Sequence, residues 1–290
     1  MCSFGLAVAN PSVQGGSSIA SEKREQEEMA ETTVGHFVWH EHMAKDEKAS
    51  IAFYSEIIGW KTEAFGSDYT MWVGEQGPLG GVMALPKEAE AMGAPPHWLG
   101  YVHVDNVDQT AAAAEQLGGR IYKAPDDIPT IGRFAVLGDP QGGVFAAFKA
   151  LKPMPPHAME KVGEVCWNEL MTSDSAAGFE FYAKLFSWKI LDRMEMGPMG
   201  TYLIYGVGEK RLGGMMTIPP PSSPNAPAMR PGWIFYFQTP NLEQTIERAK
   251  SKGATLLSDP MTVPGGGRIA QLLDPQGAVF ALHQNPPPSA

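Results

Sequence analysis

Apolar positions along the chain switch from strand-like to helix-like spacing within one recurring block. Residues 35–43 are rich in aromatic and branched side chains, which is typical of a β-strand. Asp46 then stands where a helix N-cap would, and apolar residues recur at helical spacing until Gly59. Three shorter strand-like runs follow at 60–65, 69–73 and 79–85. The pattern therefore predicts a strand, a helix and three further strands.

The same block is predicted three more times. The second copy consists of strand 98–104, helix 107–117 and strands 120–123, 133–137 and 143–149. The third consists of strand 163–171, helix 174–186 and strands 188–194, 201–207 and 211–217. The fourth begins with strand 232–239 and helix 241–252 and continues through three strands to His283. Helices and strands mix within each block, so we expect an α+β protein.

Repeated residues indicate that the blocks come in pairs. The same number of residues separates Trp39 from Trp167 and Tyr54 from Tyr182. A repeat that keeps its order over its whole length indicates a duplicated domain. The expected organisation is a poorly ordered tail at 1–34, domain 1 at 35–150, a proline-rich linker at 151–162, domain 2 at 163–284 and a C-terminal tail at 285–290.

The motif Asp-Pro-Gln-Gly occurs at 139–142 and again at 274–277. Asp at the first position, Pro at the second and Gly at the fourth favour a type I turn. We interpret both copies mainly as hairpin turns, and a functional role for the loop is the less favoured alternative.

Composition excludes several classes of function. The chain has 22 Lys and Arg against 32 Asp and Glu, a net charge of −10, so nucleic acid is not an expected partner. No apolar stretch is long enough to span a membrane. The two cysteines, Cys2 and Cys166, do not form a disulfide framework, which favours a reducing compartment. We expect a soluble cytoplasmic protein, a monomer or homodimer, that binds a small molecule.

The motifs together resemble a known family. Both halves contain Trp-(His/Asn)-Glu-(His/Leu)-Met-x-x-Asp, then Phe-Tyr, Gly-Gly-(Val/Met)-Met, and Gly-Arg ahead of Asp-Pro-Gln-Gly. This order resembles the vicinal oxygen chelate superfamily, which includes glyoxalase I, bleomycin resistance proteins and extradiol dioxygenases. The resemblance covers residues 35–149 and 163–284. It implies two tandem glyoxalase-like domains, each built from two βαβββ modules whose curved mixed sheet forms a cup around a ligand or metal.

The metal-ligand positions of the family carry over to side chains that do not bind metals. The resemblance assigns them to Trp39, Leu99 and Ala146 in domain 1 and to Trp167, Ile234 and Ala281 in domain 2. None of these side chains is a metal ligand. We therefore expect no cofactor. A divalent metal recruited by His40, His103 or His283 remains an alternative.

Strand alternation indicates which polar residues share the cup face with those positions. The candidate catalytic residues are Glu41, Glu169 and His103, and the candidate ligand-binding residues are Trp39, Tyr101, Trp167, Tyr236, Gln238 and His283. A carboxylate in an apolar cup would have a raised pKa, as a general base requires. The alternative is that each Glu accepts hydrogen bonds and has a structural role.

Three functions stay open at this point. The leading hypothesis is a glyoxalase- or bleomycin-resistance-like protein that binds an aromatic or carbonyl-containing molecule without a metal and sequesters it. The second is a lyase, isomerase or dioxygenase that uses Glu41 and Glu169 as general bases, with or without a divalent metal. The third is an interaction module whose cups are filled by their own side chains. Arg133 and Arg268 would either contact an anionic substrate or form surface ion pairs.

Overall fold

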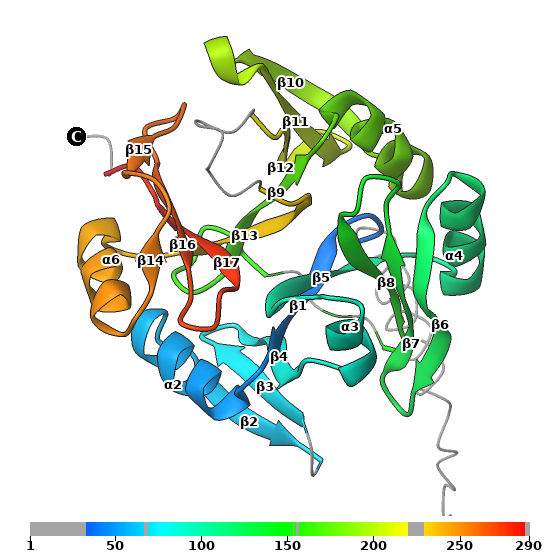
Figure 1. The fold of residues 1–290 in the computed structure, drawn as a ribbon, viewed down its shortest axis with the longest axis horizontal. Coiled ribbons are helices and arrows are strands. Elements are labelled where there is room, and N and C mark those ends of the chain that lie inside the picture. Colours follow the sequence, from blue (N-terminus) through cyan, green and yellow to red (C-terminus); the bar gives the residue numbers. More distant parts are fainter. Residues whose placement is uncertain (1–32, 67–68, 153, 155–156, 220–228, 288–290) are drawn as a thin grey trace, which may run out of the picture.

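Four strand-and-helix units surround the centre of the molecule (Figure 1). The computed structural model describes residues 33–66, 69–152, 154, 157–219 and 229–287. Most of the predicted tail at 1–34, together with Cys2, lies outside the described residues, as does most of the loop 219–231. The main helices lie at the periphery, whereas β1, β5, β9 and β13 lie near the centre.

The first domain contains one eight-stranded mixed sheet. Its elements are β1 (Phe37–Ala44), α2 (Glu47–Ile57), β2 (Lys61–Phe65), β3 (Tyr69–Gly74), β4 (Gly77–Ala84), α3 (Lys87–Ala91), β5 (His97–His103), α4 (Val107–Gln116), β6 (Arg120–Ile128), β7 (Gly132–Gly138) and β8 (Val144–Ala150). The strand order is β2-β3-β4-β1-β5-β8-β7-β6. The short helix α3 was not predicted, and β6 is longer than the predicted strand at 120–123.

The second domain repeats this arrangement with a nine-stranded sheet. Its elements are β9 (Val165–Thr172), α5 (Ser175–Phe186), β10 (Lys189–Glu195), η1 (Gly197–Met199), β11 (Thr201–Val207), β12 (Lys210–Thr217), β13 (Gly232–Gln238), α6 (Leu242–Ser251), β14 (Thr255–Leu256), β15 (Met261–Thr262), β16 (Arg268–Leu273) and β17 (Val279–Gln284). The strand order is β10-β11-β12-β9-β13-β17-β16-β14, with β15 paired to β16. The α+β architecture of two tandem domains, each with two βαβββ modules, is confirmed.

The two modules of each domain share one sheet, so the modules pair within a domain and not across the linker. Strand β1 pairs antiparallel with β5, with Trp39 opposite Tyr101. Strand β9 pairs antiparallel with β13, with Trp167 opposite Tyr236. Across the domains, α2 packs against α6 and α4 against α5. No helix in the described part of the chain is long and apolar enough to cross a membrane.

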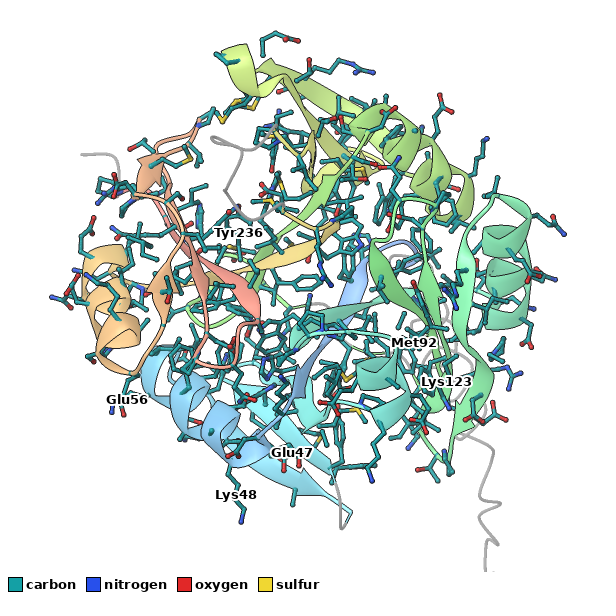
Figure 2. All side chains as sticks on the ribbon, in the orientation of Figure 1. Glu47, Lys48, Glu56, Met92, Lys123 and Tyr236 are labelled. Atoms are coloured by element: carbon teal, nitrogen blue, oxygen red, sulfur yellow. The ribbon has the colours of Figure 1, made fainter. Side chains whose placement is uncertain are left out.

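Local sequence signals place the helices as predicted. The side chain of Asp46 accepts a hydrogen bond from the Ala49 amide and caps α2, and Asp174 caps α5 in the same way. Figure 2 shows the exposed Lys48 and Glu56 on the outer side of α2, whereas Tyr236 lies among the interior side chains. The helices therefore turn their apolar faces inward, toward the sheets.

A continuous aromatic core joins the two domains. One cluster of buried side chains contains residues of both domains, among them Tyr54, Trp98, Tyr182 and Trp233. Gly100 lies where β5 meets this core, and a Cβ atom there would lie 2.5 Å from Phe37 and 2.6 Å from Phe235. Only glycine therefore fits where the two domains approach so closely.

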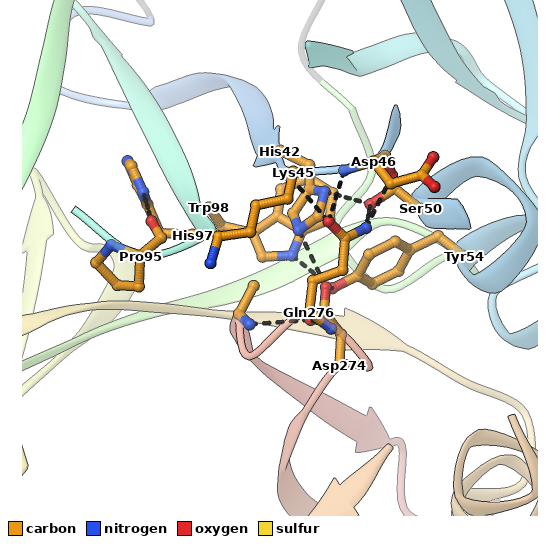
Figure 3. A network of polar contacts seen from close by, with 11 residues as sticks. His42, Lys45, Asp46, Ser50, Tyr54, Pro95, His97, Trp98, Asp274 and Gln276 are labelled. Atoms are coloured by element: carbon orange, nitrogen blue, oxygen red, sulfur yellow. Dashed lines mark hydrogen bonds and ion pairs between the residues drawn. The ribbon is translucent and has the colours of Figure 1, made fainter. Parts of the chain in front are cut away.

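Reciprocal hydrogen bonds cross the domain boundary inside this core, and Figure 3 shows the one formed by Tyr54 and Asp274. The Tyr54 hydroxyl donates to Asp274 Oδ2 at 3.1 Å and accepts from Trp98 Nε1 at 2.9 Å. At the equivalent place, the Tyr182 hydroxyl donates to Asp139 Oδ2 at 2.9 Å, and Trp233 Nε1 donates to Tyr182 at 3.2 Å. We call these two tyrosine–aspartate pairs the domain clasps.

The Asp-Pro-Gln-Gly motifs are hairpin turns and also parts of the clasps. Asp274 Oδ1 accepts from the amides of Gln276 and Ala278 in its own turn. The Gln276 side chain reaches the other domain, where its Oε1 accepts from the amides of Lys45 and Asp46 at 2.8 and 2.9 Å. Gln141 binds the start of α5 in the same way, accepting from the Asp174 amide. The turn interpretation was therefore incomplete, because turn chemistry does not reveal a tertiary partner.

Two tryptophans add a second reciprocal pair of contacts. Trp60 Nε1 donates to the carbonyl of Gly163 at 2.8 Å, and Trp188 Nε1 donates to the carbonyl of Gly35 at 2.7 Å. Each tryptophan thus binds the residue that leads into the first strand of the other domain. These bonds hold the entry of β1 and β9 in place.

Removing one clasp hydroxyl should destabilise the whole chain. Tyr54→Phe leaves Asp274 Oδ2 without its hydroxyl donor in a buried site, so the free energy of unfolding should fall by roughly 1–3 kcal/mol. Chemical denaturation followed by tryptophan fluorescence measures this change. Tyr122→Phe, at a hydroxyl-bearing ring that is 38% exposed, is the control and should change stability little. Equal stability of the Tyr54 and Tyr122 variants would show that the clasp is not stabilising.

Candidate functional site

A large cavity of about 960 Å³ takes in the cup of the first domain and extends to the domain interface, where His40, Asn168 and Leu212 also line it. Its lining is mainly apolar and aromatic, and it includes Trp39, Tyr69, Met83, Tyr101, Phe134 and Phe148. Glu41 also lines it and is only 3% exposed. A cavity of this size and composition is typical of a small-molecule site.

Strand alternation brings the predicted cup residues together. Met43, Leu99, Tyr101, Ala146 and Phe148 form one buried cluster against which Trp39 packs. The second cup has the equivalent cluster of Met171, Ile234, Tyr236 and Ala281, with Trp167 packed against it. The face predicted from alternation is therefore the face that lines each cup.

Glu41 makes an incomplete set of hydrogen bonds. Its Oε2 atom accepts from the Tyr69 hydroxyl at 3.0 Å and, at a long 3.5 Å, from the Tyr101 hydroxyl. Trp39 Nε1 donates to the Tyr69 hydroxyl at 3.0 Å and so orients it. Among the described residues, none donates a hydrogen bond to Glu41 Oε1, although that atom is buried. One oxygen of this carboxylate therefore lacks a protein partner.

Burial controls the charge of this carboxyl group. Desolvation raises the pKa of Glu41 from 4.5 to about 7, although the neighbouring polar groups of Tyr69, Tyr101 and Trp39 act in the opposite direction. Burial, followed by the neighbouring Glu41 charge, raises the pKa of Tyr69 and Tyr101 above the usual range. Both tyrosines thus remain neutral donors, while Glu41 exists in both protonation states near neutral pH.

The equivalent carboxylate of the second cup is fully hydrogen bonded. Glu169 Oε2 accepts from the Tyr202 hydroxyl at 2.8 Å. Its Oε1 accepts from the Tyr236 hydroxyl and from Gln271 Nε2, both at 3.0 Å. Burial raises the pKa of Glu169 too, against the effect of these three donors. The two cups therefore share a carboxylate but differ in how it is satisfied.

His103, Gln238 and His283, which alternation places on the same cup faces as the carboxylates, make their hydrogen bonds to other residues. His103 Nδ1 is 2.8 Å from Thr33 Oγ1, and no hydrogen bond joins His103 to Glu41. Gln238 and His283 do bind each other, with 2.6 Å between Oε1 and Nδ1, but neither is among the hydrogen-bond partners of Glu169. Burial lowers the pKa of His103 and His283, which favours the neutral rings. The structure thus pairs each carboxylate with tyrosines.

The first-strand histidines contact the other domain, and His40 also lines the cavity where it reaches the domain interface. His40 packs against Phe235 of the other domain with ring centroids 4.8 Å apart, and desolvation lowers its pKa to about 4. His42 Nδ1 lies 2.7 Å from Ser50 Oγ, and its Nε2 lies 3.1 Å from Asp274 Oδ2 (Figure 3). Both rings therefore belong to the interface between the domains, as alternation around Glu41 predicts.

The residues do not fit the metal centre that the family resemblance implies. Trp39, Tyr101 and Ala146 occupy one row across β1, β5 and β8, whereas Leu99 lies opposite Glu41. Of the residues in these two rows, only Glu41 has a side chain that binds metals strongly. Within the described ranges, no group of three or more His, Cys, Asp or Glu side chains is placed to hold a metal ion.

The two glycine-linked arginines form ion pairs at the surface. Arg133 binds Asp108 and Asp127, each at 2.8 Å, and Arg268 pairs with Glu243. The two alternatives were contact with an anionic substrate and a surface ion pair, and the structure contains the ion pair for both arginines. Exposed pairs of this kind contribute little to stability.

Three residues of the carboxylate sites were missed by sequence reasoning. Tyr69 and Tyr202 lie on β3 and β11, outside the strands to which the resemblance assigns ligand positions. The sequence repeat did indicate these two residues, since both halves have a tyrosine near the start of the corresponding strand. Gln271 had no such signal, because Val136 occupies its place in the first domain.

Comparisons of whole chains identify relatives of known name. The chain is 27% identical over 249 residues to the protein named "Putative glyoxylase CFP32" of Mycobacterium bovis, covering 84% of this chain and 92% of the relative. It is 27% identical over 259 residues to the anthracycline biosynthesis protein DnrV of Streptomyces peucetius, covering 84% and 91%. Both relatives are thus matched over nearly their whole length.

Solved structures share the fold. The Mn(II)-bound glyoxalase from Novosphingobium aromaticivorans matches with a TM-score of 0.60 and 15% identity, over 87% of this chain and 82% of the other. The 2,3-dioxygenase LapB from Pseudomonas sp. KL28 matches with a TM-score of 0.57 and 12% identity, over 88% and 92%. At these identities the similarity concerns the fold alone.

Two family models match the two halves of the chain. The model described as a glyoxalase-like domain matches residues 38–148. The model described as the glyoxalase/bleomycin resistance protein/dioxygenase superfamily matches residues 158–282. Together with the tandem fold, these matches show that the chain belongs to the glyoxalase/bleomycin resistance protein/dioxygenase superfamily, the vicinal oxygen chelate proteins.

Proposed function

We propose that the first-domain cup binds a small aromatic or carbonyl-containing molecule without a resident metal and sequesters it. The observation that carries this proposal is the cavity of about 960 Å³, in which the buried Glu41 lies against an aromatic wall. Aromatic walls suit planar ligands, and methionines such as Met71 and Met83 adapt to their shape. The names of two relatives refer to biosynthesis of anthracyclines, which are aromatic and carbonyl-rich compounds, and this agrees with the proposed ligand class.

Glu41 supports a second candidate function, a metal-independent lyase or isomerase. A general base works best with a pKa close to the working pH, and the pKa of Glu41 is about 7. Ionised Glu41 would take a proton from a carbon next to a carbonyl group, and the electron pair of that C–H bond would pass to the carbonyl oxygen as an enolate. The dioxygenase alternative requires a metal centre, for which the described residues provide no ligand set.

Filling the first cup should abolish ligand binding. Met83→Trp places a larger ring in the cavity, so the affinity for a probe such as 2-acetyl-6-methoxynaphthalene should fall at least tenfold. Titration followed by quenching of tryptophan fluorescence, with calorimetry as a second readout, measures this affinity. Met216→Trp, at the equivalent place in the second cup, is the matched control and should bind as the wild type does. Equal losses in both variants would place the ligand elsewhere.

The enzyme candidate predicts proton exchange that depends on Glu41. In D₂O, the protein should accelerate deuterium exchange at the acetyl group of the same probe, and the rate should rise with pH through about 7 as Glu41 ionises. Proton NMR follows this exchange. Glu41→Gln should abolish the acceleration, whereas Glu169→Gln should retain it. Exchange no faster than in buffer would reject base catalysis on this ketone and leave the binding proposal in place.

The raised pKa of Glu41 should also appear in the stability of the protein. Because the folded-state pKa is about 7 and the usual value is 4.5, folding favours the protonated form. The stability advantage of wild type over Glu41→Gln should therefore be largest below about pH 4.5 and fall as pH rises through about 7, by about 3 kcal/mol at most. Denaturant titrations at several pH values measure it. The exposed-site variant Glu63→Gln should follow the wild type, and parallel curves for Glu41→Gln would contradict the raised pKa.

A further inference from the structure

The two cups differ at one residue that contacts the carboxylate. In the second cup, Gln271 donates to Glu169 Oε1 at 3.0 Å and to the Tyr236 hydroxyl at 2.9 Å. In the first cup, the tyrosine pair is retained as Tyr69 and Tyr101, but no described residue donates an amide hydrogen bond to Glu41. The cups therefore differ in two ways: the first has no amide donor among the described residues, and both of its tyrosines donate to Oε2, whereas Tyr236 donates to Oε1 of Glu169.

Strand register identifies the residue that causes this difference. In the second domain, Gln271 lies opposite Ala281, which lies beside Tyr236. In the first domain, Val136 lies opposite Ala146, which lies beside Tyr101. Valine therefore occupies the glutamine position and ends before the carboxamide would begin.

Without an amide at position 136, and with both tyrosines donating to Oε2, the other oxygen of Glu41 is unpaired. Glu41 Oε1 is buried without a hydrogen bond from any described residue, and buried polar atoms in native proteins nearly always have a partner. Glu41 itself lines the cavity of about 960 Å³. A molecule in this cavity is thus in a position to provide the donor that the protein lacks.

We infer that the ligand of the first cup donates a neutral hydroxyl group, such as a phenol or enol, to Glu41 in place of the missing amide, and that Val136 selects for it. This inference rests on the proposed function, since it specifies the ligand of the same cup. Above the Glu41 pKa of about 7, a carbonyl oxygen would not serve, because an ionised carboxylate accepts hydrogen bonds and donates none.

A neutral hydroxyl fits this site better than a charged amine. The ligand must leave water for a cavity with aromatic walls and a carboxylate that is only 3% exposed. Desolvating an ammonium group costs far more than desolvating a hydroxyl. A phenol also places its ring against the aromatic wall while its hydroxyl reaches the carboxylate. In the second cup both oxygens of Glu169 already have hydrogen-bond donors, and Gln271 is one of them.

A matched pair of probes tests the inference. The probes are 2-acetyl-6-hydroxynaphthalene and its methyl ether, which differ only in the hydrogen-bond donor. Wild-type protein at pH 8 should bind the hydroxyl probe at least tenfold more tightly than the ether. Val136→Gln provides the missing amide and should reduce this ratio to about one, while Gln271→Leu in the second cup should preserve it. Affinities come from fluorescence titration and calorimetry.

Val136→Leu separates hydrogen bonding from size. Leucine resembles glutamine in length but has no donor, so the variant should keep the preference for the hydroxyl probe. Circular dichroism and thermal melting of both Val136 variants establish that they fold. A preference lost equally in Val136→Leu and Val136→Gln would overturn the inference.

The remaining outcomes distinguish the inference from the proposed function. Equal affinity of the wild type for both probes, still weakened by Met83→Trp, would overturn the inference and retain ligand binding in the first cup. Failure of the wild type to bind either probe would overturn both. A tighter complex with the methyl ether would likewise contradict a donor requirement.

Discussion

The buried hydrogen bonds from Tyr54 to Asp274 and from Tyr182 to Asp139 are the constraint on which the rest of the structure depends. Each bond joins the first helix of one domain to a hairpin turn of the other, inside one aromatic core. The aspartates also accept hydrogen bonds from amides of their own turns, so turn geometry and domain contact depend on the same carboxylates. A shift of one domain relative to the other would break the hydrogen bonds of both clasps.

This arrangement gives the central strands two different faces. On β1, His40 and His42 face the domain interface, whereas Glu41 between them faces the cup. The interface fixes the strand, and the strand fixes the carboxylate in an apolar wall. Desolvation then raises the pKa of Glu41 toward neutrality. The packing between domains thus contributes indirectly to the chemistry of the site.

The two domains share their interdomain contacts more closely than the contacts of their buried carboxylates. The clasps and the reciprocal tryptophan bonds occur in both copies, as does the tyrosine-bound carboxylate. The third carboxylate partner differs, with Gln271 in one cup and Val136 in the other. Both oxygens of Glu169 therefore have hydrogen-bond donors, whereas one oxygen of Glu41 has none among the described residues.

The sequence alone determined the repeat and the order of the elements, because these follow from repeated residues and local periodicity, and alternation around the positions that the family resemblance implies identified the cup face. Trp39, Glu41 and Tyr101 were assigned to one wall from alternation, and Asp46 to a helix cap. Only the tertiary structure decided that the modules pair within a domain, that Gln276 binds α2, and that Tyr69 rather than His103 reaches Glu41. These contacts join residues far apart in the chain, so their geometry depends on how the sheets curve and pack, which local patterns do not specify.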